Sequence, residues 1–143
     1  MGVNIEISEL NACFGRWQFQ NFDKYEEQRK ANYQYLYDTL SDNKNLKVFE
    51  HPNIGGSVFV FPVYLKNGMT VNDAYKKLSA QGVEIRTLIG GVKKKKKAYR
   101  FISDEIFTNA HDMAEHTFFI GIHQTIPYDN AKAVAEIINK TFS

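Results

Sequence analysis

The sequence predicts an α+β fold in which two helices come first and a small sheet packed with helices follows. Two observations support this class. Apolar residues recur at helical spacing through residues 7–40, and beyond residue 46 short apolar runs alternate with helical patterns over short links. We expect three or four mostly antiparallel strands, with the helices packed on one face of the sheet. The length of 143 residues fits one domain, with a helical segment at 1–42 and an α/β unit at 46–143.

The first helix is predicted to begin after Ser8, whose hydroxyl is placed to cap the first turn. Four large apolar residues stand at steps of three, four and three, which puts them on one helical face. These residues are Ile7, Leu10, Phe14 and Trp17. We expect this face to be buried, and we expect Cys13 to be buried with it as a small apolar side chain.

The second helix is longer, because helical spacing continues for about five turns and stops at the polar cluster 41–45. Its regularly spaced face carries Phe22, Tyr25, Arg29, Tyr33, Leu36 and Leu40. Strands are predicted at Leu46–Phe49 and Ser57–Leu65. The second strand is apolar almost throughout, which predicts cover on both faces. Pro62 cannot donate to a ladder, so this strand is expected to lie at an edge or to end there.

Thr70 is the predicted N-cap of the next helix, with Asp73 three residues on in capping-box spacing. The side chains expected to face inward from this helix are Val71, Ala74, Tyr75 and Leu78. Gly82 follows, where a helix end favours a residue that adopts positive φ. The alternation from Val83 to Arg86 is typical of a half-buried strand.

Three more elements complete the predicted fold. They are a short helix at 109–117, a strand at 118–122 and a terminal helix at 127–142. The inward residues of the terminal helix are predicted to be Ala131, Val134, Ile137 and Ile138.

Composition and charge argue against several classes of function. A net charge of +2 is too small to indicate a nucleic-acid surface. A single cysteine allows no intrachain disulfide, and no Cys and His cluster has metal-ligand spacing. No apolar run approaches the roughly 20 residues of a membrane span, and no signal peptide opens the sequence. We therefore expect a cytoplasmic protein without a metal, nucleic-acid or membrane partner.

Four residues are candidates for ligand binding, and no nucleophile motif predicts a catalytic residue. Asn4 precedes the first helix, where its amide can donate to an anion or merely close an Asx turn. Arg86 and Arg100 flank a glycine- and lysine-rich loop, and each guanidinium can hold a phosphate or carboxylate or pair with a nearby acid. His123 follows the last strand, where an imidazole can act as acid or base or simply pack at the strand end.

The segment from Gly2 to Gly15 reads Gly-Val-Asn-Ile-Glu-Ile-Ser-Glu-Leu-Asn-Ala-Cys-Phe-Gly. It resembles the Gly-x-Asn and Ser-Glu-Leu-x-Ala-Ala-x-Gly segment of the DegT/StrS-type sugar aminotransferases, pyridoxal-phosphate enzymes that act on nucleotide-linked keto-sugars. Further segments of resemblance are Arg29–Tyr33, Tyr35–Leu36, Gly82–Gly91, Ala98–Tyr99, Asn109–Ala110 and Phe118–Ile122.

The resemblance implies the C-terminal small domain of a fold-type I enzyme, with the large cofactor-binding domain and the Schiff-base lysine upstream of Gly2. In that family the asparagine of Gly-x-Asn reaches the cofactor phosphate of the partner subunit in a homodimer. Asn4 is therefore expected to contact pyridoxal 5'-phosphate. Arg86, Arg100 and His123 are the residues expected to contact the nucleotide-sugar substrate.

The implied activity is transfer of an amino group to a nucleotide-linked keto-sugar in cell-surface polysaccharide or deoxysugar biosynthesis. One alternative is a deoxysugar-nucleotide 3-dehydratase. The other is a non-catalytic, stand-alone or redesigned domain. Because the lysine that holds the cofactor is expected upstream, this chain alone is expected to be inactive.

The run Lys93–Lys97 departs from the family pattern, which carries mixed polar residues between the double glycine and the Ala-Tyr pair. A run of like charges is typical of a solvated segment. The alternative is that it attracts the diphosphate of a nucleotide-sugar, in which case the affinity falls as salt rises.

Overall fold

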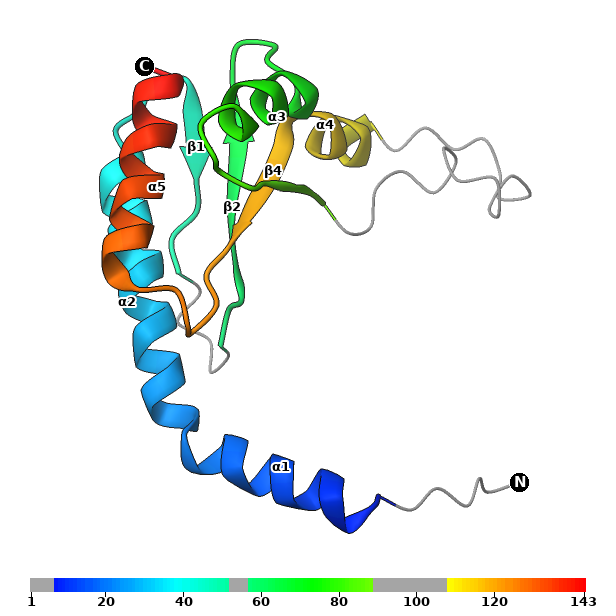
Figure 1. The fold of residues 1–143 in the computed structure, drawn as a ribbon. Coiled ribbons are helices and arrows are strands. Elements are labelled where there is room, and N and C mark those ends of the chain that lie inside the picture. The colour runs from blue at the N-terminus through cyan, green and yellow to red at the C-terminus, as the bar shows by residue number, and fades with distance from the viewer. Residues whose placement is uncertain (1–6, 52–56, 89–107) are drawn as a thin grey trace, which may run out of the picture.

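The computed structural model describes residues 7–51, 57–88 and 108–143. Asn4, Arg100 and the run Lys93–Lys97 lie outside the described residues, so the expectations for them stay predictions. In chain order the elements are α1 (Glu9–Gln20), α2 (Phe22–Leu40), β1 (Leu46–Val48), β2 (Val60–Leu65), α3 (Val71–Ser79), β3 (Arg86–Thr87), α4 (Thr108–His116), β4 (Thr117–Gly121) and α5 (Tyr128–Thr141) (Figure 1).

The four strands form one antiparallel sheet in the order β1-β2-β4-β3, which confirms the predicted α+β class and strand number. Residues directly opposite each other in an antiparallel pair point to the same face. Val63 is opposite Phe118 and Phe61 is opposite Ile120, so these four share one face of the sheet. All four are buried there.

Helices α2 and α5 lie side by side over this face, and α3 contacts α5 (Figure 1). Their side chains join the strand residues in one apolar cluster. The most deeply buried helical side chains include Leu36, Leu40, Leu78 and Ile138, each at most 1% exposed. The core therefore lies between one sheet face and these helices.

The opposite face of the sheet is only partly covered, which corrects two expectations. Along β2 the buried residues alternate with half-buried ones, so the strand is not enclosed on both faces. Helix α4 packs on this second face, whereas we expected all helices on one face. There the Tyr64 hydroxyl donates to Asp112 Oδ2 at 3.0 Å, and the Tyr64 and His116 rings meet edge to face.

The expectation that β2 lies at a sheet edge or ends at Pro62 was wrong, because β2 lies between β1 and β4 and continues to Leu65. Its pairing with β1 ends at Val63, which is opposite Val48. Pro62 therefore has no ladder partner on the β1 side, and the interior strand tolerates its missing donor.

The expected burial of the α1 face was also wrong within the described chain. Ile7, Leu10, Phe14 and Trp17 are 76%, 66%, 63% and 53% exposed, and Cys13 is exposed as well. The reason is that α1 turns away from α2 at Asn21 and leaves the α/β unit (Figure 1). Its predicted cap is confirmed, since Ser8 Oγ accepts from the Asn11 amide at 3.3 Å.

Local hydrogen bonds fix both ends of α3. Thr70 Oγ1 accepts from the Asp73 amide at 3.3 Å, and Asp73 Oδ2 accepts from the Thr70 amide at 3.1 Å. At the other end Gly82 has φ of 77°, and the amides of Gly82 and Val83 donate to Ser79 and Leu78. These bonds form a Schellman motif and direct the chain toward β3.

Tyr75 in α3 is 56% exposed, against the prediction that it faces inward. It stands at the margin of the helical arc that Val71, Ala74 and Leu78 bury, so this short helix encloses a narrower face than its pattern suggested.

Asn32 joins α2 to the turn before α5. Its side chain is fully buried, and its Nδ2 donates to the Ile126 carbonyl at 3.1 Å. Its Oδ1 accepts from Gln28 Nε2 at 3.1 Å. The amide group therefore has a partner on both atoms, as a buried polar group requires.

Replacing Asn32 by alanine should lower the free energy of unfolding by about 1–3 kcal/mol, because the Ile126 carbonyl then loses its buried donor. Urea denaturation followed by circular dichroism measures this. The matched control is Glu27→Ala on the exposed side of α2, for which a change within about 0.5 kcal/mol is expected. Equal losses in the two variants would contradict the assigned role of Asn32.

The capping box should make stability depend on pH. Hydrogen bonds from Thr70 hold the pKa of the Asp73 carboxyl below its ordinary value. The folded-state pKa thus lies below the unfolded-state pKa, so this contribution is complete above the unfolded value and is lost as pH falls through the folded one. The stability difference between the protein and Asp73→Asn should therefore shrink in acid.

Urea denaturation at neutral pH and near about pH 3 measures this difference on both sides of the titration. The control is Thr70→Ala, which removes the hydroxyl donor and keeps the backbone amide donor, so it should weaken the dependence without abolishing it while lowering stability by about 1 kcal/mol. A difference that is the same at both pH values would exclude this coupling.

Candidate functional site

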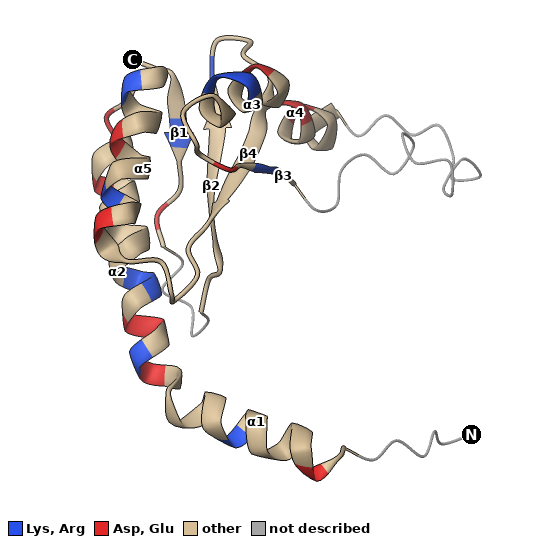
Figure 2. Cartoon of the chain, viewed as in Figure 1, with Lys and Arg blue, Asp and Glu red and all other residues tan. Residues whose placement is uncertain are grey.

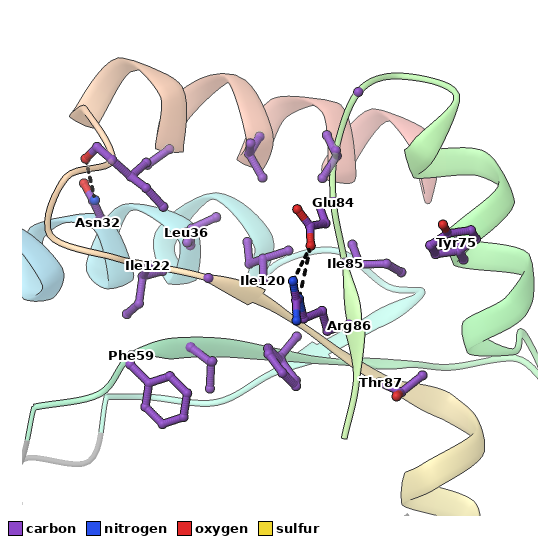
Figure 3. A pocket seen from close by; sticks show the side chains of 18 residues that line it. Asn32, Leu36, Phe59, Tyr75, Glu84, Ile85, Arg86, Thr87, Ile120 and Ile122 are labelled. Atoms are coloured by element: carbon purple, nitrogen blue, oxygen red, sulfur yellow. Dashed lines mark hydrogen bonds and ion pairs between the residues drawn. The ribbon is translucent and has the colours of Figure 1, made fainter. Parts of the chain in front are cut away.

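A groove of about 1150 Å³ lies between the segment Gly82–Thr87 and β4, with α2 and α5 behind it (Figure 3). Its walls are mainly apolar. The apolar residues include Leu36, Val83, Ile85, Ile120, Ile122 and Val134. Concave apolar surfaces with a few polar groups at their margin are typical of ligand sites.

The groove exists because β3 pairs with β4 over two residues only, Arg86 with Phe119 and Thr87 with Phe118. Before this ladder the chain parts from β4. Val83 and Ile85 are 5% and 4% exposed, so they point into the core. Glu84 and Arg86 alternate with them and point the other way, which places Arg86 outward at the margin of the groove.

Arg86 is paired with Glu84 (Figure 3). Its Nε and one terminal nitrogen donate to Glu84 Oε1 at 3.1 and 2.8 Å. The two side chains are 72% and 75% exposed. Exposed ion pairs contribute about 0–1 kcal/mol, so a phosphate or carboxylate can replace Glu84 at little cost. The ion pair with Glu84 therefore does not prevent Arg86 from binding a substrate. Substrate binding by Arg86 remains a prediction.

His123 is exposed just beyond β4 and does not line the groove. Its Nδ1 accepts from the Thr125 amide at 3.3 Å and lies 2.9 Å from the Thr125 hydroxyl. A neutral ring in this geometry carries its proton on Nε2.

The structure does not bring Arg86 and His123 together. Phe119, the β4 partner of Arg86, stands four residues before His123, which is about 13 Å along an extended strand. Of the four predicted binding residues, these two occupy separate places and the other two lie outside the described residues.

Sequence reasoning missed a network around Arg29. The Arg29 NH1 group donates to Ser57 Oγ at 3.1 Å, and its Nε donates to Gln124 Oε1 at 3.1 Å. Its NH2 group also donates to Gln124 Oε1. Arg29 thus ties α2 to the chain before β2 and to the turn after β4. The available signal was a charged residue standing in the apolar row of the second helix.

This network fixes the turn that carries His123, because Gln124 is its neighbour. All three hydrogen bonds go to neutral oxygens, and no described carboxylate forms an ion pair with Arg29. The described residues therefore present two arginines suited to anions, one exchangeable at the groove margin and one held in place.

Other kinds of site find no support in the described parts of the chain. No group of three or more His, Cys, Asp or Glu residues there could hold a metal ion. Within the same ranges, no helix has both the length and the apolar character needed to cross a membrane.

Comparison with known proteins relates this geometry to one family. Lipopolysaccharide biosynthesis protein RfbH of Salmonella typhimurium is 28% identical over 151 residues, which cover 99% of this chain and 34% of that protein. The chain thus spans about a third of the length of this curated relative.

Solved structures share the fold. The aminotransferase from Psychrobacter cryohalolentis matches with a TM-score of 0.86 at 18% identity, over 99% of this chain and 40% of that one. The E. coli GDP-4-keto-6-deoxy-D-mannose-3-dehydratase with bound hydrated pyridoxal phosphate matches with a TM-score of 0.81 at 22% identity, over 95% of this chain and 36% of that one. At these identities the likeness concerns the fold alone.

A family model provides the decisive match. It describes the DegT/DnrJ/EryC1/StrS aminotransferase family and matches residues 1–139, nearly the whole chain. The chain therefore belongs to the DegT/DnrJ/EryC1/StrS aminotransferase family.

Proposed function

We propose that this chain forms the small domain of a pyridoxal-phosphate enzyme that transfers an amino group to a nucleotide-linked keto-sugar. The observation that carries the proposal is the family match over residues 1–139. The name of the Salmonella relative, a lipopolysaccharide biosynthesis protein, supports a role in polysaccharide synthesis. We further propose that the complete enzyme is a cytoplasmic homodimer.

Pyridoxal phosphate, when bound, supplies an electron sink that allows an amino group and a carbonyl oxygen to be exchanged. None of the described residues that line the groove is a lysine, so the groove itself offers no amine for a Schiff base with the cofactor. Asn4, which the resemblance assigns to the cofactor phosphate, lies outside the described residues. We therefore derive no step of the reaction through the cofactor.

The contribution proposed for the described residues is substrate binding. Arg86 presents a guanidinium at the groove margin, where it can exchange Glu84 for a phosphate oxygen. Arg29 and Gln124 hold the turn after β4, which sets the place of His123. These residues orient an anionic substrate, and none of them needs to take part in bond breaking.

A second candidate is 3-dehydration of a deoxysugar nucleotide. It is favoured by the fold of the E. coli 3-dehydratase, which matches this chain with a TM-score of 0.81. The TM-score for the Psychrobacter aminotransferase is 0.86. The structure of the small domain alone does not separate the two reactions. A third candidate is a non-catalytic, stand-alone or redesigned domain.

The product of the reaction distinguishes the candidates. The polypeptide that carries this chain, loaded with pyridoxal phosphate, should convert a GDP-linked 4-keto-6-deoxysugar in the presence of glutamate. An aminotransferase yields a sugar with nitrogen in place of the keto oxygen, whereas a 3-dehydratase yields one that has lost its C3 hydroxyl. Mass spectrometry of the product separates them.

The control in this assay is the 143-residue chain without additional polypeptide, which should give neither product. With that chain, borohydride reduction should fix no cofactor on a lysine. Formation of neither product by the longer polypeptide would support the non-catalytic module, and a lysine labelled within Lys93–Lys97 would contradict the expected upstream position of the Schiff base.

Arg86→Gln should weaken binding of the GDP-linked sugar by about tenfold to a hundredfold, because a charge-assisted hydrogen bond to phosphate contributes roughly 1.5–3 kcal/mol. The matched control, Glu84→Gln, frees Arg86 and should leave the affinity unchanged or raise it. Isothermal titration at low and high salt measures the affinity of both variants for this sugar. The difference between their affinities should be smaller at high salt, because salt screens the charge of Arg86. Equal affinities for the two variants would remove Arg86 from the site.

A further inference from the structure

The turn that joins β2 to α3 contains the one Asn-Gly pair of the sequence, Asn67-Gly68. Both residues are exposed. Asn67 has φ of 61° and Gly68 has φ of 74°, so both lie in the left-handed region. The Met69 amide donates to the Lys66 carbonyl across them at 3.4 Å. These features are typical of a type I′ turn, whose two central positions favour asparagine and glycine.

The backbone nitrogen of Gly68 is accessible for reaction. Glycine has no side chain to shield this nitrogen, and its backbone rotates more freely than that of other residues. A Cβ built on Gly68 would meet no atom within 4 Å, so the space around it is open. Among the described residues, the Gly68 amide has no hydrogen-bond acceptor.

The charge of the turn also favours a reaction at this nitrogen. The link between β2 and α3 carries a single charged residue, the cation Lys66, directly before Asn67 (Figure 2). A nearby positive charge stabilises the anion that forms when a backbone amide loses its proton. That anion is the nucleophile that can attack the neighbouring side-chain amide.

We propose that Asn67 is a deamidation site, at which the chain modifies itself in water. The Gly68 nitrogen gives its proton to hydroxide and forms a bond to Asn67 Cγ. The bond from Cγ to Nδ2 then breaks, and the nitrogen leaves as ammonia. One water molecule opens the resulting five-membered imide at either of its two carbonyl carbons. The products are an aspartate and an isoaspartate, and water is the co-reactant.

One contact restrains this reaction. Asn67 Nδ2 donates to Asn45 Oδ1 at 2.6 Å. Asn45 is itself held in place, because its Nδ2 donates to the Phe142 carbonyl at 2.9 Å and its backbone amide donates to Asn43 Oδ1 at 2.9 Å. The Asn67 side chain must leave this partner before its Cγ can approach the Gly68 nitrogen. Asn45 therefore acts as a positioning residue that slows deamidation.

The modification changes the contacts of the turn. The aspartate product has no N–H to donate, so its carboxylate and Asn45 Oδ1 are two acceptors that face each other. Asn45 can offer its Nδ2 to the carboxylate only by turning its amide over and giving up the Phe142 carbonyl. Phe142 is the C-cap residue of α5. Deamidation therefore weakens the attachment of the end of α5 to this turn.

Incubation of the folded polypeptide that carries this chain, in mildly alkaline buffer, tests the proposal. Each event should release one ammonia and lower the formal net charge of the chain by one, so ion-exchange chromatography separates the product. Peptide mass spectrometry should locate the change at Asn67. An isoaspartyl methyltransferase should label the isoaspartate form at the same residue. The asparagines that precede larger residues should stay unchanged.

The decisive variant is Asn45→Ala, which removes the restraining acceptor. It should raise the rate of deamidation at Asn67 by about twofold to tenfold, the range that one hydrogen bond accounts for. The matched control is Asn72→Ala, the same change at an exposed residue of α3. Its rate should stay within about twofold of that of the unchanged chain. In urea the unfolded chain should react faster than the folded one, because it has lost the contact with Asn45.

Three outcomes would overturn the proposal. One is no change at Asn67 in the folded protein over a time in which the urea-unfolded chain converts. Another is an equal rate for the Asn45→Ala and Asn72→Ala variants. The third is conversion spread over all asparagines, or accelerated at all of them by Asn45→Ala, which would indicate general unfolding. None of these measurements depends on the proposed enzymatic reaction.

Discussion

The packing of α2 against α5 over one sheet face is the constraint on which the rest of the described fold depends. Leu36 of α2 and Ile138 of α5 both belong to the apolar cluster between these helices and the strands. The turn from β4 to α5 must reach this layer, and Asn32 receives it through the Ile126 carbonyl. Arg29, one helical turn earlier, holds the same turn through Gln124. One side of α2 thus supplies both the core and the anchors of the turn that carries His123.

The same packing explains the groove. Val83 and Ile85 are drawn into the core, so the chain leaves β4 before it forms the two-residue β3. An apolar hollow remains at this sheet edge, and Arg86 emerges beside it with the exposed Glu84 as its partner among the described residues. A surface ion pair is easily exchanged, whereas the guanidinium of Arg29 is fixed by neutral acceptors. The two arginines therefore differ in role for reasons of packing rather than of residue type.

Features formed by residues close together in the sequence were predictable, and features that join residues far apart in the sequence were not. The caps at Ser8 and Thr70 and the glycine end at Gly82 depend on residues within a few positions, so their patterns sufficed. The edge position expected from Pro62 failed because strand order is a property of the whole sheet. The Arg29 network was missed because its partners lie 28 and 95 residues away. Arg86 was identified as a candidate from the sequence, but the sequence did not show that Glu84 is the acid with which it pairs.

The first helix shows what an apolar period means physically. Spacing of three and four residues identifies the side chains that share a face, and it says nothing about which surface covers them. The prediction that this face is buried failed within the described chain because α1 leaves the α/β unit. This face nevertheless keeps the composition of a buried surface, with the charges placed elsewhere on the helix. Periodicity and exposure are therefore consistent if the cover of this face comes from outside the described residues.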